Sequence, residues 1–303
     1  MKKEPYKMTS IAEVHRILEV PGPEHPLLSV VDLDAIKCYA IEDLRSVVYS
    51  FYCVSIKKNF KGKMKYGQRY YDFDDGVMTF FSPGQVVSAD IDENLKLEGW
   101  WLLIHPDFLK SYPLAKTIRE YGFFSYAVHE ALHLSPKEED TVTAIIRNIQ
   151  QEYHSPIDTY SQNVIIAQIS LLLNYCDRFY NRQFITRKNA NNDLLVQLEE
   201  LLSSYFNGDQ VRQRGLPTVQ YLSEQLHVSP DYLSDMLRSV TGMNTQQHIH
   251  HQLIEKAKEI LTTTSLSVSE IAYSLGFEYP QSFNKLFKNK TSLSPLAFRN
   301  SFN

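Results

Sequence analysis

The stretch that decides the fold covers residues 269–299 and reads SEIAYSLGFEYPQSFNKLFKNKTSLSPLAFR. Its apolar residues repeat those of an earlier segment of the same chain. Before a short turn the two copies are offset by 49 residues, so that Leu222 corresponds to Ile271. After the turn the offset is 50, so that Leu233 corresponds to Phe283. One added residue in the turn, with the apolar spacing kept on both sides, predicts two copies of a helix, a turn and a second helix.

Capping signals support these helices and the segment between the copies. Ser229 followed by Pro230 is typical of a helix start, and Gly276 stands where the second turn needs a positive φ. Between the copies, an amphipathic helix is predicted over residues 244–263, with Asn244 as its N-cap. Such a helix is roughly 28 Å long at 1.5 Å per residue. That length can hold two recognition helices against successive major grooves, which are about 34–36 Å apart.

Specific residues in both copies carry a family resemblance. In the second copy they are Ser269-Glu270-Ile271-Ala272, Gly276-Phe277, Phe283, Phe287-Lys288, Ser294-Pro295 and Phe298-Arg299. In the first half they are Tyr232-Leu233-Ser234, Thr241-Gly242 and Ile254-Glu255-Lys256-Ala257-Lys258. Over about residues 217–303 the chain resembles AraC-type (AraC/XylS) bacterial transcriptional regulators. Two residues depart from the family pattern: Ser292 replaces a usual glycine, and Asp235 stands where many relatives carry a basic residue.

The resemblance implies an α+β protein that regulates transcription by binding DNA. Residues 1–184 would form a cupin-like antiparallel β-barrel with a helical hairpin, which senses an effector or mediates dimerisation. The polar composition of residues 185–192 predicts a linker, and residues 193–303 are expected to form an all-α domain with two helix-turn-helix motifs. The implied partners are double-stranded promoter DNA, a small-molecule effector, a second copy of the chain and RNA polymerase. No enzymatic activity, cofactor or membrane partner is expected.

The first domain shows β-type patterning followed by helical patterning. Short runs rich in Val, Tyr and Phe occur at 46–56, 77–81, 85–89 and 97–104, separated by turn signals. Such regular spacing favours an antiparallel sandwich or barrel. Two amphipathic helices are predicted at 135–153 and 160–182, joined by a short turn as an antiparallel hairpin. Their apolar stripes either cover the barrel or meet a second subunit.

Composition agrees with a cytoplasmic protein. Hydrophobic residues make up 43% and charged residues 22% of the chain, as in ordinary soluble domains. The net charge of −4 lies entirely before Thr186, because 11 basic and 11 acidic residues follow it. The three cysteines, Cys38, Cys53 and Cys176, are far apart, which predicts reduced thiols. The polar start predicts no signal peptide.

The second recognition helix is expected at 280–290, with a polar outward face. The candidate DNA-binding residues on it are Gln281, Ser282, Asn284, Lys285, Lys288 and Lys290. Gln and Asn can pair with adenine, and Lys can donate to guanine. Lys288, Lys290 and Arg299 are better suited to phosphates, and no acidic residue follows Glu278. The alternative interpretation is a solvated helix face.

The first recognition helix, from Asp231 to Val240, exposes Asp231, Ser234, Asp235 and Arg238. An aspartate can accept a hydrogen bond from cytosine, but phosphates repel carboxylates. This copy therefore either reads bases selectively at a cost in affinity, or docks weakly while Asp235 makes a structural contact. We favour weak docking, with Arg238 on a phosphate.

The sequence His129-Glu130-Ala131-Leu132-His133 matches the HExxH zinc-protease pattern. That chemistry needs both imidazoles on one face of a helix, and a third ligand, for which Glu152 is a candidate. However, Ser135-Pro136 begins the next helix, so the pattern falls in a connection. A strand or turn is the preferred interpretation, and a zinc-dependent hydrolase using 129–133 is the alternative function.

Two further clusters allow more than one interpretation. His248, His250 and His251 open the helix at 244–263, where they could bind metal, contact phosphate or be solvated. We favour phosphate contact or solvation, because two histidines on one face make a poor metal site. Residues 51–81 mix aromatic residues with lysines. That region is either an effector or partner surface, or a solvated hairpin with its aromatic residues inside.

Overall fold

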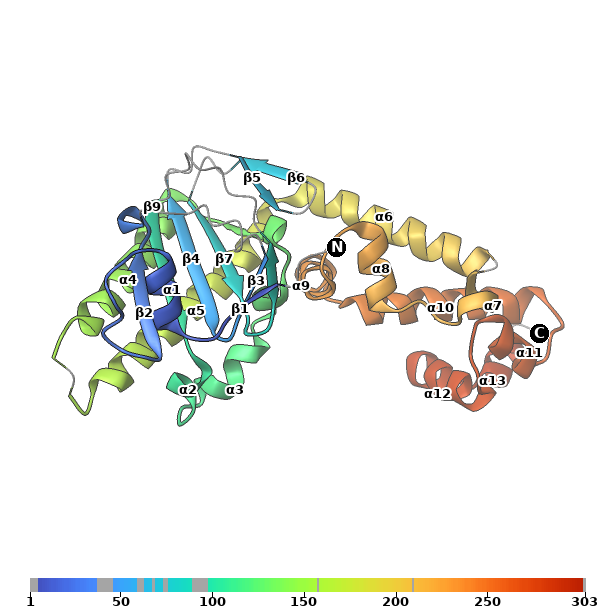
Figure 1. Cartoon of the computed structure of the whole chain (residues 1–303). Coiled ribbons are helices and arrows are strands. Elements are labelled where there is room, and N and C mark those ends of the chain that lie inside the picture. Colours follow the sequence, from blue (N-terminus) through green and yellow to red (C-terminus); the bar gives the residue numbers. More distant parts are fainter. Residues whose placement is uncertain are drawn as a thin grey trace. The chain divides into compact units, whose positions relative to one another are not determined.

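The computed structural model describes residues 5–36, 46–58, 63–66, 69–72, 76–88, 98–156, 158–208 and 210–301. The chain divides into two compact units, Met1–Gln183 and Phe184–Asn303 (Figure 1). The first unit contains strands and helices, whereas the described part of the second is helical. The predicted α+β class is therefore confirmed.

A five-stranded antiparallel sheet forms the centre of the first unit. Its strand order is β10 (Leu132–His133), β7 (Val77–Phe81), β4 (Tyr52–Lys58), β9 (Glu98–Ile104) and β2 (Leu28–Asp32). A three-stranded sheet has the order β1 (Tyr6–Met8), β3 (Ser46–Tyr49) and β8 (Val86–Ser88), and β5 (Lys63–Tyr66) pairs with β6 (Arg69–Asp72). The four predicted β runs thus fall on β3, β4, β7, β8 and β9.

The described strands do not form the closed antiparallel barrel expected from the resemblance. They form separate open sheets, and β1 pairs with β3 in parallel. On one edge of the central sheet, β10 is only two residues long, and the helix that begins at Pro136 follows almost at once. Alternating side chains predict strands, but closure depends on which distant edges pair, and local sequence does not encode that pairing.

Two long helices form the predicted hairpin, α4 (Pro136–Tyr153) and α5 (Ser161–Thr186). Ser135 and Glu138 form a capping box at the start of α4. Within the first unit, α5 runs behind the central sheet (Figure 1). The buried Cys176 of α5 contacts Met78 of β7 at 3.8 Å between the sulfur atoms. The buried stripe of α5 therefore covers the sheet, which settles one of the two roles left open by the sequence.

Several short helices in the first unit have no counterpart in the sequence analysis, because turns of three or four residues are too short to show periodicity. They are η1 (Leu33–Ala35), α2 (Pro106–Leu109), α3 (Leu114–Thr117), η3 (Ile118–Glu120), η4 (Gly122–Ser125) and η5 (Val128–Glu130). A helix α1 (Ile11–Ile17) precedes them, and Ser10 accepts a hydrogen bond from the Glu13 amide at its start.

The predicted linker at 185–192 is helical except around Arg187, because α5 ends at Thr186 and α6 (Lys188–Asn207) follows. Its polar composition predicts a loop, but Asn191 is buried and donates a hydrogen bond to the Phe184 carbonyl. A buried amide in this position stabilises the joint between two helices. Whether the segment acts as a linker stays a prediction.

Two helix-turn-helix copies follow in the second unit. The first is α8 (Val219–Leu226) with α9 (Pro230–Thr241), and the second is α11 (Val268–Ser274) with α12 (Pro280–Thr291). Between the copies lies α10 (Thr245–Thr263), and the short helices α7 (Gln210–Arg214) and α13 (Pro295–Asn300) flank the repeat. Figure 1 shows α9 beside one end of α10 and α11 near the other. The repeat predicted from the offsets of 49 and 50 residues is therefore present.

Both copies use the same two left-handed backbone positions. The turn positions are His227 (φ 57°) and Gly276 (φ 83°), and the positions after the second helix are Gly242 (φ 78°) and Ser292 (φ 63°). Glycine thus occupies a different one of the two positions in each copy. At Gly276 a side chain is also excluded sterically, because a Cβ would lie 2.9 Å from the carbonyl carbon of Gly215.

We expect Gly276→Ala to lower the free energy of unfolding by more than about 2 kcal/mol, since it combines left-handed strain with a backbone clash. Conversely, Ser292→Gly should raise it by up to about 1 kcal/mol, because glycine adopts the same φ without strain. Urea unfolding followed by circular dichroism measures both changes. An unchanged stability for Gly276→Ala would contradict the assigned turn geometry.

Candidate nucleic-acid interface

The orientation of α12 is fixed by aromatic side chains on one of its sides. Phe283 and Phe287 are fully buried, with their ring centroids 5.7 Å apart. The ring centroids of Phe283 and Phe277 are 5.5 Å apart, as are those of Phe287 and Phe298 of α13. Because this side of the helix is packed against protein, the opposite side faces solvent.

The second set of predicted DNA-binding residues lies on α12. Gln281, Ser282, Asn284, Lys285, Lys288 and Lys290 are all exposed. Between Pro280 and Thr291 there are three lysines and no acidic residue. Lys288 and Lys290 lie in the last turn, where positive charge interacts favourably with the free carbonyl groups of the helix end. This face therefore has a positive potential despite the negative charge of the whole chain.

A groove of about 420 Å³ runs beside this face. It is lined by Val268, Asn284, Lys285, Lys288, Ser294, Pro295 and Leu296. The apolar part of this surface, where Leu296 is 57% exposed, was not predicted from the sequence. An apolar residue directly after the Ser294-Pro295 helix start was the available signal, because that position in the first turn faces outward.

Tyr279 was also missed by the sequence analysis. It is the N-cap residue of α12, its side chain makes no capping hydrogen bond, and it is 64% exposed. The repeat offset of 50 pairs it with Ser229, whose hydroxyl accepts a hydrogen bond from the Tyr232 amide in the first copy. An aromatic residue in place of a capping serine could have marked this position as one with another role.

The equivalent residues of α9 contact one another or the neighbouring helix. Ser234 is half-buried, and its hydroxyl lies 2.9 Å from that of Thr245 at the start of α10. Arg238 donates to Asp235 at 2.6 Å, forming an ion pair one turn apart. Asp231 is exposed. The outward side of α9 therefore presents an internally neutralised ion pair, unlike the three lysines of α12.

Arg299 is half-buried and bonded to two backbone carbonyls. Its guanidinium donates to the carbonyl of Leu261 at 3.0 Å and to that of Leu266 at 2.7 Å. These carbonyls lie at and just after the end of α10, so Arg299 fastens α13 to that helix end. These bonds use Nε and Nη2 of Arg299, and its binding to phosphate stays a prediction.

The histidines at the start of α10 lie in different environments. His248 is buried, and its Nε2 lies 2.8 Å from the Thr241 hydroxyl. The expected solvation is therefore wrong for His248, and a phosphate contact stays a prediction. Nε2 of His250 lies 2.9 Å from the Gln246 amide nitrogen, and burial together with the Lys290 charge lowers the pKa of His250. His251 is exposed.

The HExxH residues lie on a turn and a short strand instead of a helix. His129 and Glu130 belong to η5, and His133 belongs to β10. Glu130 is buried and accepts a hydrogen bond from the Ala127 amide at 2.6 Å. The zinc-protease mechanism requires both imidazoles on one face of a helix. The turn and short strand observed here do not provide that spacing. Within the described residues, no group of three or more His, Cys, Asp or Glu side chains could hold a metal ion.

Other predicted features fall partly outside the described side chains. Most side chains of the lysine-rich region 51–81 lie outside the described part of the structure. Of its described lysines, Lys58 has its Nζ 2.7 Å from Oε1 of Glu139, and Lys57 is buried. Cys38 lies outside the described residues, whereas Cys53 and Cys176 are free and buried. Burial raises the pKa of the Cys53 thiol. Of the helices that the structure describes, none has the length and apolar character needed to cross a membrane.

Comparisons with known proteins give a family-model match within the second unit and longer matches to individual regulators. A family model described as a helix-turn-helix domain matches residues 222–301. The chain is 23% identical over 158 residues to the uncharacterized HTH-type transcriptional regulator YijO of Escherichia coli, which is 52% of each protein. It is 34% identical over 82 residues to the uncharacterized HTH-type transcriptional regulator YisR of Bacillus subtilis, covering 27% of this chain and 29% of that protein.

The HTH-type transcriptional activator RhaS of Escherichia coli is 28% identical over 151 residues, covering 50% of each protein. The chain thus spans about half the length of YijO and RhaS, and less of YisR. The matched helix-turn-helix domain coincides with the tandem repeat recognised in the sequence.

We expect acid to destabilise the second unit through His248. Burial lowers its pKa, the charge of His251 lowers it further, and Glu199 of α6 raises it. The unfolded chain, where a histidine pKa is about 6.5, therefore takes up the proton first. The stability that His248 contributes is complete above about pH 6.5 and is lost as the pH falls through its lower folded-state pKa.

Urea unfolding of the full chain at several pH values between about 7 and 5 measures this loss. In His248→Gln the unfolding midpoint should fall less with pH than in the wild type. His227→Asn replaces an exposed histidine of the same unit and should leave the pH dependence unchanged. Equal pH dependence in His248→Gln and the wild type would refute the role of His248.

Proposed function

On the premise that residues 222–301 are an AraC/XylS-type helix-turn-helix domain, we propose that the chain is a sequence-specific DNA-binding transcriptional regulator. The observation that carries this proposal is the outward side of α12, which is exposed, polar and free of acidic residues within its helix. The opposite side is held by buried phenylalanines, so the polar face is presented rigidly. A rigid helix of this kind is suited to the major groove of B-DNA.

Residues on α12 divide into base-reading and phosphate-binding groups. Gln281 and Asn284 carry amides that can pair with adenine, and Lys285 can donate to guanine. Ser282 can contact either a base or the backbone. Lys288 and Lys290, in the last turn, are suited to phosphates, which position the helix without reading sequence.

The first copy contributes less affinity in this proposal. The ion pair between Arg238 and Asp235 must open, or must share the guanidinium, before Arg238 can bind a phosphate. Ser234 is engaged with Thr245, which limits its reach toward a base. Asp235 therefore orients Arg238, and α9 docks on the backbone while α12 reads the sequence. We expect selection from random DNA to enrich bipartite sites with about one helical turn between halves.

The first unit is proposed to sense an effector and to mediate dimerisation. Cupin-like domains have this role in regulators of this type. Besides its buried stripe, α5 carries a second, exposed stripe. The exposed stripe comprises Tyr160, just before the helix, and Val164, Ala167, Leu171, Asn174 and Arg178. Their spacing alternates between four and three residues, which is the heptad spacing of helices that pair with one another.

Two exposed aliphatic residues make this stripe a candidate contact between two copies. Val164 is 42% exposed and Leu171 is 43% exposed, two helical turns apart. A two-fold dimer built on such a stripe would bring the same surface of both chains together. Pairing also doubles the number of DNA-binding units, and RNA polymerase at the promoter is the further proposed partner.

We expect Lys285→Ala to weaken DNA binding more than Ser234→Ala, because it removes an exposed cation from the base-reading face. Gel-shift titration against a selected site measures the order. Lys137→Ala, at an exposed position of α4 in the first unit, is the matched control and should bind like the wild type. Lys288→Ala should reduce the salt dependence by roughly one phosphate contact. The reverse order for Lys285 and Ser234 would overturn the assignment of the two copies.

We expect Val164→Glu to shift the protein toward monomer, because dimerisation through the α5 stripe would bury the new carboxylate in an apolar contact. Sedimentation velocity over a concentration series measures this change. Val86→Glu, at a valine of β8 that is 55% exposed, introduces the same group elsewhere and should not affect assembly. Dimerisation at wild-type affinity in Val164→Glu would exclude this face as the interface.

A further inference from the structure

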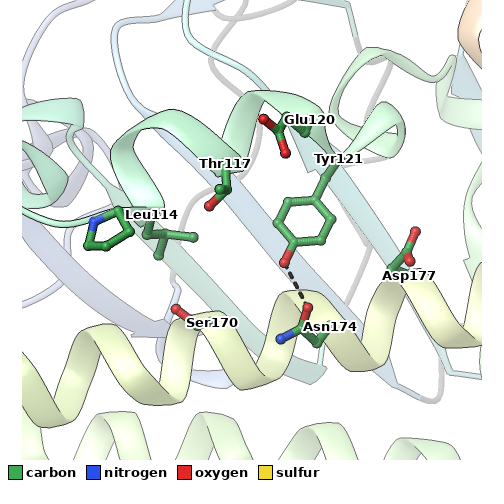
Figure 2. A pocket seen from close by; sticks show the side chains of 8 residues that line it. Leu114, Thr117, Glu120, Tyr121, Ser170, Asn174 and Asp177 are labelled. Carbon is green, nitrogen blue, oxygen red and sulfur yellow. Dashed lines mark hydrogen bonds between the residues drawn. The ribbon is translucent and has the colours of Figure 1, made fainter.

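A hollow of about 460 Å³ lies on the first unit, between α5 and the segment from Pro113 to Tyr121 that includes α3 and η3 (Figure 2). It is lined by Pro113, Leu114, Thr117, Glu120, Tyr121, Ser170, Asn174 and Asp177. Its volume falls within the range of small-molecule sites, about 300–1,000 Å³. The function proposed above makes no use of this hollow.

Hydrogen bonds hold the segment over α5 at two points. The Tyr112 hydroxyl donates to Asn163 at 2.6 Å, and the Tyr121 hydroxyl donates to Asn174 at 2.9 Å. The two asparagines are eleven residues apart on α5, which is about 16 Å along a helix. The second of these bonds is drawn in Figure 2, where Tyr121 reaches from the short helical segment to α5. The segment from Tyr112 to Tyr121 is thus hydrogen-bonded to α5 at both of its ends.

The charge of the lining selects the class of ligand. Among the lining residues, Glu120 and Asp177 carry carboxylates, and there is no Lys, Arg or His. Burial raises the pKa of Tyr121, and the negative charges of Asp177 and Glu120 raise it further. Thr117 and Ser170 add hydroxyl groups, and Leu114 adds an apolar wall.

A metal ion fits this lining poorly. Hard cations such as Ca²⁺ take about six to eight oxygen ligands, and Mg²⁺ needs a compact octahedron. In the described part of the chain, no cluster of three or more His, Cys, Asp and Glu residues could hold an ion. A protonated amine can instead donate to a carboxylate of the lining, Glu120 or Asp177. Hydrogen bonds to a charged group are about twice as strong as neutral ones.

We propose that this hollow binds a small primary amine, and that its occupancy alters dimerisation through α5. Asn174 belongs both to the hollow and to the exposed stripe, and Leu171 of the stripe follows Ser170 of the hollow. An amine in the hollow would break or strengthen the hydrogen bond between Tyr121 and Asn174. Either effect changes how Asn174 is held in the surface that a second copy contacts. Only this coupling rests on the proposed function, whereas amine binding does not depend on it.

Calorimetric titration of the full chain tests the site with isosteric pairs. Putrescine and glucosamine are the amines, and 1,4-butanediol and glucose are their neutral counterparts. We expect at least one amine to bind at least tenfold more tightly than its neutral counterpart. Equal binding within both pairs, no binding by either amine, or binding of Mg²⁺ or Ca²⁺ in place of the amines would overturn the proposal.

Variants then locate the binding. Glu120→Gln combined with Asp177→Asn should weaken amine binding at least tenfold, whereas Asp140→Asn, an exposed acid of α4 outside the hollow, should not. Thr117→Trp fills the hollow without removing a charge and should abolish binding, which keeps the test valid if the double variant misfolds. Wild-type amine affinity in both Thr117→Trp and a folded double variant would place the amine elsewhere.

Sedimentation with and without saturating amine tests the coupling, for which we expect at least a threefold change in the dimer dissociation constant. An unchanged constant would refute the coupling. DNA binding measured on the same samples separates the two proposals. Amine binding without specific DNA binding removes the proposed function and leaves the site, whereas DNA binding without amine binding removes the site alone.

Discussion

The burial of Phe283 and Phe287 is the constraint on which the DNA-binding interpretation depends. These two rings lie about one turn apart on α12 and contact Phe277 and Phe298 in a continuous aromatic cluster. A helix with one side held in this way cannot rotate without exposing aromatic surface to water, which is costly. The side that carries Gln281, Lys285 and Lys288 is therefore fixed toward solvent, and its chemistry follows from packing on the other side.

The same backbone unit occurs twice in the second unit, but its two copies have different surfaces. Both need left-handed residues at equivalent positions, and each meets one of the two requirements with glycine. Their outward residues differ, since α9 pairs Asp235 with Arg238 while α12 has only basic charges. The two copies thus share their backbone geometry but differ in surface charge. In the proposed function, this difference allows one copy to dock on the DNA backbone and the other to read the sequence.

In the first unit, α5 serves several surfaces at once. One stripe is buried against the central sheet, as the contact between Cys176 and Met78 shows. Another stripe exposes Val164 and Leu171, and Asn174 of that stripe lines the hollow together with Ser170 and Asp177. A ligand in that hollow and a second copy on the exposed stripe would therefore act on the same rigid helix.

The sequence by itself determined the repeat, the two long helices of the hairpin, most of the strands and the polar face of α12, because all of these follow from local periodicity and capping. Only the tertiary structure decided that the sheets stay open, that residues 188–192 are helical, and that Ser234, His248 and Arg299 are engaged within the protein. A polar side chain has the same pattern in a sequence whether it meets solvent, DNA or a distant carbonyl. Its partner is chosen by packing between segments far apart in the chain, and the hollow beside α5 is formed by that same packing.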